Sequence, residues 1–191
     1  MARSARVARE TGETVVKVEL DLDGRGQGEV QTGLPFFDHM LQQLAIHGLF
    51  DLKVSATGQD QHHKVEDVAI ALGRALHKAL GEKGGIARMG HALVPMDEAL
   101  AQVAVDLGGR GYAQIDAPIG DAEGIKGDLI AHFLESLARE GRFNLHVQVR
   151  GQNDHHKAEA LFKALARALA SATRIEKRRQ GRPPSTKGVI D

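Results

Sequence analysis

Apolar and polar residues alternate along several stretches of this chain and follow a helical spacing along others. Alternation at every second position is typical of half-buried strands. It predicts strands over residues 14–22, 28–32, 50–56, 100–107 and 143–149, with an extra strand over residues 86–94. Apolar residues at helical spacing predict four helices, over residues 38–48, 61–79, 128–140 and 154–169. Residues 1–13 are polar and basic, and we assign no element to them.

The second half of the chain repeats the first. When residues 39–76 are laid on residues 132–169 without a gap, 19 of the 38 positions are identical. The segment DLDGRG at residues 21–26 recurs as DLGGRG at residues 106–111, an offset of 85 instead of 93, so one half carries an eight-residue insertion, which we place near residues 119–127. The repeat predicts an α+β fold of duplicated β-β-α-β-α halves, each a mixed sheet with two helices on one face, fused into one body.

The glycine-rich segment at residues 81–85 is the boundary that we predict between the halves, which then span residues 1–85 and 86–191. A length of 191 residues, with 42% hydrophobic and 26% charged residues, is ordinary for a globular protein. The formal net charge of zero gives no argument for a nucleic-acid partner, and no apolar run reaches the roughly 20 residues that span a bilayer. The absence of cysteine excludes thiolate metal sites, and we expect a cytoplasmic protein.

The repeat duplicates a His-His-x-x-Glu motif at the start of a helix. Successive helical residues diverge by about 100°, so the two adjacent histidines cannot easily bind one ion but can serve two. One further histidine per half is duplicated, and the potential ligands are His39, His62, His63, Glu66, His132, His155, His156 and Glu159. Divided between two metals, they supply three histidines and one carboxylate each, which leaves two positions open on a six-coordinate ion. Manganese, iron, zinc and nickel all accept such ligands, and six-coordination favours manganese or iron.

A single motif of this kind is more often a solvated helix start than a ligand set, and the duplication in phase is what favours metal binding. We attribute the duplicated Lys64 and Lys157 to a solvated helix face. The ligand set alone also permits a dinuclear metal hydrolase or a histidine-rich metal-storage or sensor protein. A nucleic-acid module is least favoured, because the only basic cluster is at the C-terminus.

Several ordered motifs resemble the imidazoleglycerol-phosphate dehydratase family of histidine biosynthesis: GLPFFDHML, DQHHKVEDVAIALGRAL, GIARMG, PMDEAL, DLGGRGY, HFLESLA, NDHHKAEALFKALARAL and RPPSTKGVID, within residues 3–191. The resemblance implies a metal-dependent carbon–oxygen lyase that converts imidazole glycerol phosphate to imidazole acetol phosphate. It implies two Mn²⁺ per active site and a homo-oligomer of 24 subunits with sites at subunit contacts. It also implies that the duplicated histidines, Glu66 and Glu159 are the metal ligands, and that the residues contacting substrate, with the phosphate bound by the basic ones and the serine, are Glu13, Gln43, Arg88, Arg110, Lys163, Ser185 and Lys187.

This chemistry removes a hydroxyl and a carbon-bound proton next to an imidazole ring. Metals at the ring nitrogens would stabilise an imidazolate, whose electrons can expel the hydroxyl as a diazafulvene-like intermediate forms. A carboxylate must carry protons. Glu13 is our leading candidate because it is not needed as a ligand, and Glu66 is the second.

Overall fold

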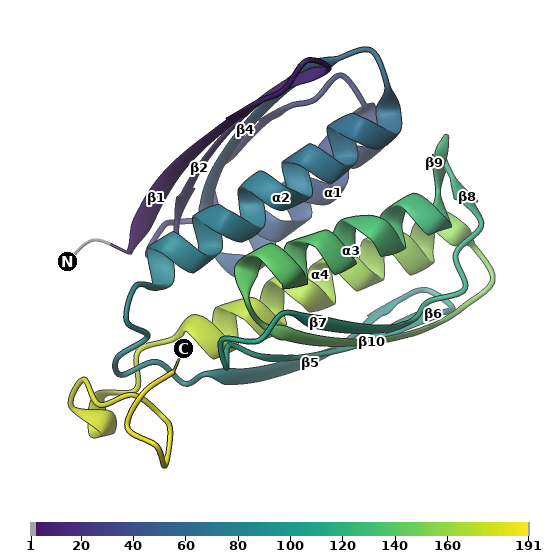
Figure 1. Cartoon of the computed structure of the whole chain (residues 1–191). Coiled ribbons are helices and arrows are strands. Elements are labelled where there is room, and N and C mark those ends of the chain that lie inside the picture. The colour runs from purple at the N-terminus through teal and green to yellow at the C-terminus, as the bar shows by residue number, and fades with distance from the viewer. Residues whose placement is uncertain (1–2, 191) are drawn as a thin grey trace.

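The protein is a stack of four layers, with one sheet on each outside and two pairs of helices between them (Figure 1). The computed structural model describes residues 3–190, so Met1, Ala2 and Asp191, at the ends of the two predicted halves, lie outside the described residues. Each helix pair covers one face of the sheet of its own half and packs on the helix pair of the other half (Figure 1).

The two halves share one order of elements. In the first half these are β1 (Ser4–Glu10), β2 (Thr14–Asp21), β3 (Gly28–Gln31), α1 (Pro35–Gly48), β4 (Asp51–Gly58) and α2 (Gln61–Leu80). In the second half they are β5 (Met89–Met96), β6 (Ala99–Asp106), β7 (Tyr112–Asp116), the short pair β8 (Asp121–Ala122) and β9 (Ile125–Lys126), α3 (Gly127–Gly141), β10 (Asn144–Arg150), α4 (Asp154–Thr173) and the 3₁₀ helix η1 (Lys177–Arg179).

The sheets have the same strand order, β1-β2-β4-β3 and β5-β6-β10-β7. In both, the first three strands in this order pair antiparallel and the fourth pairs parallel to the third. The predicted α+β class with duplicated halves and mixed sheets is therefore confirmed. The boundary between the halves stays a prediction, although the chain does pass from α2 to β5 through the segment where we placed it.

The structure adds β1 and β7, which the sequence pattern did not reveal. Both are edge strands, and both bury few apolar residues: Val7 is the only fully buried residue of β1, and Ala113 and Ile115 on β7 are half-buried. Edge strands commonly carry charged and polar residues, which prevent pairing with other chains. Each half is thus β-β-β-α-β-α, and the extra strand predicted near residues 86–94 is β5, the counterpart of β1.

Helix α1 begins three residues before the predicted start at Asp38. Pro35 occupies the first turn, where its missing N–H and fixed φ are tolerated. The carboxylate of Asp38 instead accepts a hydrogen bond from the backbone N–H of Thr32, 2.9 Å away, and so joins the helix to the end of β3.

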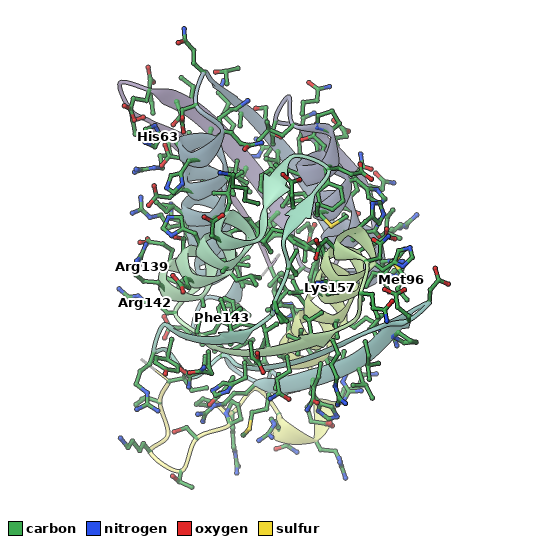
Figure 2. All side chains as sticks on the ribbon, turned by 90° about the vertical axis from the view of Figure 1, so that its right-hand side faces the viewer. His63, Met96, Arg139, Arg142, Phe143 and Lys157 are labelled. Atoms are coloured by element: carbon green, nitrogen blue, oxygen red, sulfur yellow. The ribbon has the colours of Figure 1, made fainter. Side chains whose placement is uncertain are left out.

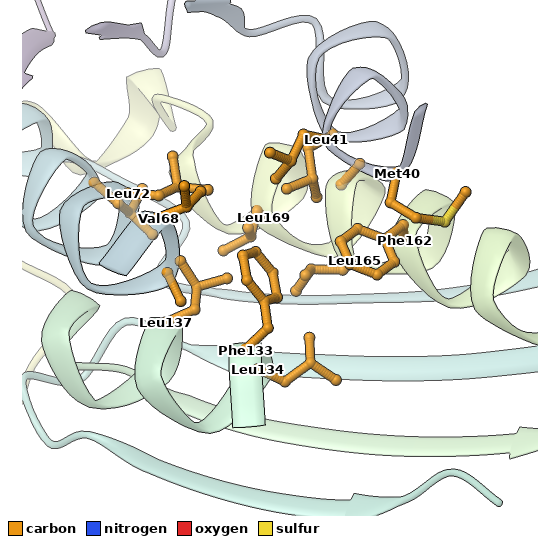
Figure 3. Close-up of a cluster of buried hydrophobic side chains, with 14 of the residues drawn as sticks. Met40, Leu41, Val68, Leu72, Phe133, Leu134, Leu137, Phe162, Leu165 and Leu169 are labelled. Carbon is orange, nitrogen blue, oxygen red and sulfur yellow. The ribbon is translucent and has the colours of Figure 1, made fainter. Parts of the chain in front are cut away.

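The core lies where the helices of the two halves meet. Aromatic and aliphatic side chains from all four helices interdigitate there (Figure 3), including Met40, Leu41, Val68, Leu72, Phe133, Leu134, Leu137, Phe162, Leu165 and Leu169. Phe133 packs edge-on against Phe37, with ring centroids 5.4 Å apart, and also contacts Phe162. This shared core holds the first turns of the helices from different halves next to one another. Among residues 3–190, no helix is both long enough and apolar enough to cross a membrane.

Candidate metal centre

Both motif helices begin in the same way. The side chain of Asp60 accepts a hydrogen bond from the backbone N–H of His63 at the start of α2, and Asn153 accepts one from His156 at the start of α4. These caps satisfy backbone donors of the first turn. They fix the helix start at the histidine pair, so the two motifs hold equivalent positions in the two halves.

The first group of potential ligands joins the two halves. His39 of α1 meets His155 and Glu159 of α4, and one ligand atom from each lies within 4.8 Å of the others. Glu159 Oε2 is 3.3 Å from His39 Nε2 and 3.0 Å from His155 Nε2. Ligands from the two halves therefore come together within one chain.

Glu159 is buried, and Lys163 lies one turn after it on α4. Lys163 Nζ is 2.7 Å from Glu159 Oε1. Burial raises the pKa of Glu159, but hydrogen bonds from Lys163, His39 and His155 outweigh burial and lower the pKa to about 2. The carboxylate is therefore charged at neutral pH, as a metal ligand must be.

The second group mirrors the first, with His62 and Glu66 from α2 and His132 from α3. His132 Nε2 is 3.2 Å from Glu66 Oε1, and the rings of His62 and His132 stack with centroids 5.1 Å apart. His132 Nε2 is buried, and its orientation gives it no hydrogen bond to any described residue despite its proximity to Glu66. A buried ring nitrogen without a hydrogen bond is costly unless another partner uses its lone pair.

These observations fit a metal ion at each group. Imidazole nitrogens and a carboxylate are suitable donors for divalent first-row metals. Each group supplies three donors, so an ion bound there keeps positions for a further protein ligand and for substrate. Both glutamates of the predicted ligand set, and four of its six histidines, belong to the two groups.

The remaining two motif histidines face carboxylates instead. His63 Nδ1 is 2.9 Å from Glu13 Oε2, and His156 Nδ1 is 2.8 Å from Glu98 Oε2. Hydrogen bonds from the backbone N–H of Asn153 and from His156 lower the pKa of Glu98 to about 2. Glu98 was not among the predicted site residues, although the sequence holds a signal for it: Glu98 follows Glu13 by 85 residues, the offset of the repeated DLDGRG segment.

Lys64 and Lys157 are buried, so the prediction of a solvated helix face for them was wrong. Lys64 Nζ donates to the carbonyl oxygen of Thr32 at 3.1 Å. Lys157 Nζ donates to the carbonyl oxygen of Pro118 at 2.5 Å and lies 2.6 Å from Asp154 Oδ1. Each lysine thus ties its motif helix to the segment that leads into the neighbouring helix of the same half, because a buried ammonium group requires such partners.

The predicted substrate-contacting residues fall into separate places. Gln43 Nε2 lies 3.3 Å from His39 Nε2, and Lys163 contacts Glu159, so both adjoin the first group. Glu13 adjoins His63 at the start of α2.

The other four predicted contacts lie at the opposite end of α4. The backbone N–H of Arg88 donates to the carbonyl oxygen of Ala172, and its guanidinium pairs with Asp106 and donates to the carbonyl oxygen of Pro184. Ser185 follows directly in the C-terminal segment. Arg110 and Lys187 are exposed. At a rise of 1.5 Å per residue, the 17 helical residues from His155 to Ala172 separate the metal-ligand end of α4 from the end near Arg88 by roughly 25 Å.

Figure 2 looks onto the end of the molecule where the motif helices begin, with the β8–β9 hairpin between α2, which carries His63, and α4, which carries Lys157. This hairpin is the predicted insertion. It contacts both helices: Gln61 Nε2 donates to the carbonyl oxygen of Gly124 at 3.2 Å, and the backbone N–H of Gly120 donates to Asp154 Oδ1 at 2.9 Å.

Comparison with known proteins gives one consistent result. The family model described as imidazoleglycerol-phosphate dehydratase matches residues 32–169. The imidazoleglycerol-phosphate dehydratase of Dehalococcoides mccartyi (strain ATCC BAA-2266 / KCTC 15142 / 195) is 58% identical over 99% of this chain and 98% of its own length. The imidazoleglycerol-phosphate dehydratase of Methanothermobacter thermautotrophicus is 57% identical over 100% of this chain and 98% of its own length.

Two solved structures share the whole fold. The crystal structure of IGPD from Pyrococcus furiosus in complex with (S)-C348 matches with a TM-score of 0.85 and 40% identity, and covers 96% of this chain and 100% of that one. The imidazoleglycerol-phosphate dehydratase of Staphylococcus aureus subsp. aureus N315 matches with a TM-score of 0.80 and 30% identity, over 91% and 99%.

Proposed function

The chain belongs to the imidazoleglycerol-phosphate dehydratase family, and from this membership we propose that it dehydrates imidazole glycerol phosphate to imidazole acetol phosphate in histidine biosynthesis. The observation that carries the proposal is the pair of ligand groups, each built from both halves of the chain. The reaction removes a proton from one carbon and a hydroxyl from its neighbour. It therefore needs groups that acidify a carbon-bound proton next to an imidazole ring.

The proposed metal centres are the two groups, with manganese as the metal that the family resemblance implies. Divalent ions bound there would lower the pKa of the substrate's imidazole and so acidify the neighbouring carbon-bound proton. His39, His155 and Glu159 would hold one ion, and His62, Glu66 and His132 the other. His63 and His156, which belong to neither group, would complete the centres of a neighbouring copy.

We place the complete active site at a contact between subunits. The metal groups lie near the first turns of α2 and α4, whereas Arg88 and Ser185 lie near the last turn of α4. A small phosphorylated substrate cannot bridge roughly 25 Å. A second copy must therefore bring its phosphate-binding residues to the metal groups, in agreement with the 24-subunit assembly that the resemblance implies.

Glu13 remains our candidate for the residue that carries the proton, since it belongs to neither ligand group. Its side chain is exposed and faces His63, so it also positions a proposed ligand. Glu13→Gln separates these roles if metal content is measured alongside turnover. Loss of turnover with both ions retained supports proton transfer, whereas near-normal turnover with both ions retained excludes it.

The test of the whole proposal is formation of the enol or ketone product from imidazole glycerol phosphate. The purified protein is chelated, and product is measured with and without added Mn²⁺. We expect turnover that returns with Mn²⁺. Absence of any metal-dependent product would refute the proposal.

A metal-storage protein would have no use for separate phosphate-binding residues. Arg110→Ala distinguishes this alternative, because Arg110 is exposed and belongs to neither ligand group. The dehydratase should keep its metal and lose substrate affinity. Unchanged substrate binding in this variant would argue against Arg110 as a phosphate ligand.

A further inference from the structure

The β8–β9 hairpin contributes a carboxylate to one ligand group and none to the other. Glu123, at the tip of the hairpin, has its Oε1 atom 2.7 Å from His155 Nδ1. The first half has no such hairpin, because β3 leads almost directly into α1. His62, the counterpart of His155, receives no side-chain hydrogen bond from any residue between 3 and 190; its ring stacks on His132.

Building on the proposed function, we propose that Glu123 is a positioning residue that strengthens metal binding at the centre formed by His39, His155 and Glu159, and so makes the two centres unequal. A carboxylate can only accept, so the hydrogen bond keeps the proton of a neutral His155 ring on Nδ1. When an ion is bound, Nε2 then supplies the lone pair, and it is the atom that lies 3.0 Å from Oε2 of Glu159, another ligand of the same group. Carboxylates in this position orient a ligating histidine and raise its basicity.

The backbone conformation at Glu123 indicates that glutamate is not at this position to stabilise the turn. Glu123 and Gly124 form the two-residue tip of the hairpin, and both have positive φ, 52° and 85°. Such tips favour Asn-Gly or Asp-Gly, because few other residues adopt this backbone conformation readily. A glutamate there is unfavourable for the turn itself, whereas its longer side chain reaches the His155 ring.

The hairpin is also held in place independently of Glu123. Gln61 Nε2 anchors the carbonyl oxygen of Gly124 from α2, and Asp154 anchors Gly120 from α4. Among residues 3–190, the Glu123 side chain has one hydrogen-bonding partner, His155. Its substitution therefore removes one interaction from one centre and leaves the anchors of the hairpin.

The experiment is a Mn²⁺ titration of the chelated full-length protein, in which electron paramagnetic resonance measures free Mn²⁺. Glu123→Asn is the main variant, since asparagine suits the turn but is too short to reach the ring. We expect about 10- to 100-fold weaker binding at one of two sites per chain, with the other unchanged. The melting temperature of the metal-free protein should stay the same or rise.

Two further variants separate positioning from general damage. Glu123→Gln keeps the length of the side chain and an accepting oxygen, so it should retain most of the wild-type Mn²⁺ affinity. Gln61→Ala removes an anchor of the same hairpin, and its Mn²⁺ affinities should remain within about threefold of the wild type, well below the losses typical of a lost ligand-orienting partner.

Equal Mn²⁺ affinities in wild type and Glu123→Asn, or an equal loss at both sites, would overturn this inference while leaving the proposed function intact. A loss of Mn²⁺ affinity in Gln61→Ala as large as that in Glu123→Asn would also overturn it, because the position of the hairpin and not the carboxylate would then determine the affinity. A wild-type protein that binds no Mn²⁺ would instead refute the manganese centres of the proposed function, and this inference with them.

Discussion

His39 of α1 faces Glu159 of α4, with 3.3 Å between Nε2 and Oε2, although 120 residues separate them in the chain. Because the second group is arranged in the same way, through His132 and Glu66, each half supplies the third ligand to the motif of the other. A duplicated half could not form either group alone. The packing of the helices between the two sheets is therefore a condition for the chemistry as well as for stability.

Removing the ligand that one half supplies to the motif of the other should prevent metal binding at one centre and leave the other centre unchanged. We expect His39→Ala to lower bound metal from about two ions to about one per chain, because a ligand lost from a site with few protein donors greatly weakens binding. Metal content after dialysis against a weak chelator, measured by elemental analysis, provides the readout. His47→Ala is the matched control on the same helix, since His47 belongs to neither ligand group. Retention of two ions in His39→Ala would show that His39 is not a ligand.

The buried lysine of the second motif should matter for stability. Lys157→Met keeps the length of the side chain but leaves the carbonyl of Pro118 without its donor and removes the ion pair with Asp154, whose carboxylate keeps the backbone N–H of Gly120. Leaving a buried polar group unsatisfied costs about 1–3 kcal/mol, and these two acceptors are only partly buried. We therefore expect the free energy of unfolding of the metal-free protein to fall by about 1–2 kcal/mol.

Chemical denaturation followed by circular dichroism measures this loss. Lys78→Met is the control, because Lys78 lies exposed on the last turn of α2. Its effect should stay within about 0.5 kcal/mol. A similar small effect for Lys157→Met would mean that its buried contacts contribute little net stability.

The pair formed by Glu98 and His156 should make stability depend on pH. The hydrogen bond that the His156 ring donates to Glu98 raises the pKa of His156 above its ordinary value of 6.5. A histidine whose pKa is raised in the folded state contributes stability that is complete below pH 6.5 and is lost as the pH rises through the folded-state pKa. The melting temperature of metal-free wild type should therefore exceed that of Glu98→Gln by more at about pH 5.5 than at about pH 9.

A second exposed glutamate serves as the control for this pH dependence. Glu29 pairs with Lys53, with 2.7 Å between the charged atoms, and no histidine takes part in this pair. The difference between wild type and Glu29→Gln should be the same at both pH values. A constant difference for Glu98→Gln as well would show that Glu98 acts only on the backbone N–H groups of Gln152 and Asn153.

Most of the fold was predictable because the repeat supplied two copies of each signal. The central strands, the edge strands β3 and β5 and all four helices were found, whereas β1 and β7 were not, because each of these two strands buries at most one apolar residue. The burial of polar residues could not be predicted from the sequence: Lys64 and Lys157 have the sequence context of solvated residues, and only tertiary packing buries them.

The candidate site was predictable in composition but not in pairing. The repeat identified the eight potential ligands, yet spacing along the chain cannot say that His39 joins the motif of the other half. Glu123 has no counterpart in the repeat, so no duplicated signal pointed to it. Residues that act through an insertion become visible only when the insertion is placed against the repeated elements.

The close approach of α2 and α3 gives a final prediction about how the halves hold together. Gly73 lies in α2 at the crossing, and a Cβ atom there would come within 2.8 Å of the carbonyl oxygen of Leu137 and 2.9 Å of the backbone nitrogen of Gly141. Alanine favours a helix over glycine by about 1 kcal/mol, so propensity alone predicts a gain for Gly73→Ala. We expect a net loss of about 1–3 kcal/mol instead, because backbone atoms of α3 must move apart. Chemical denaturation of the metal-free protein measures this loss, with Gly12→Ala as the control, since nothing lies within 4 Å of a Cβ at that turn.

The same displacement would separate His132 on α3 from Glu66 on α2, so Gly73→Ala should also weaken metal binding at the second group more than at the first. A stabilised variant with unchanged metal affinity would show that the two halves can shift against each other without cost.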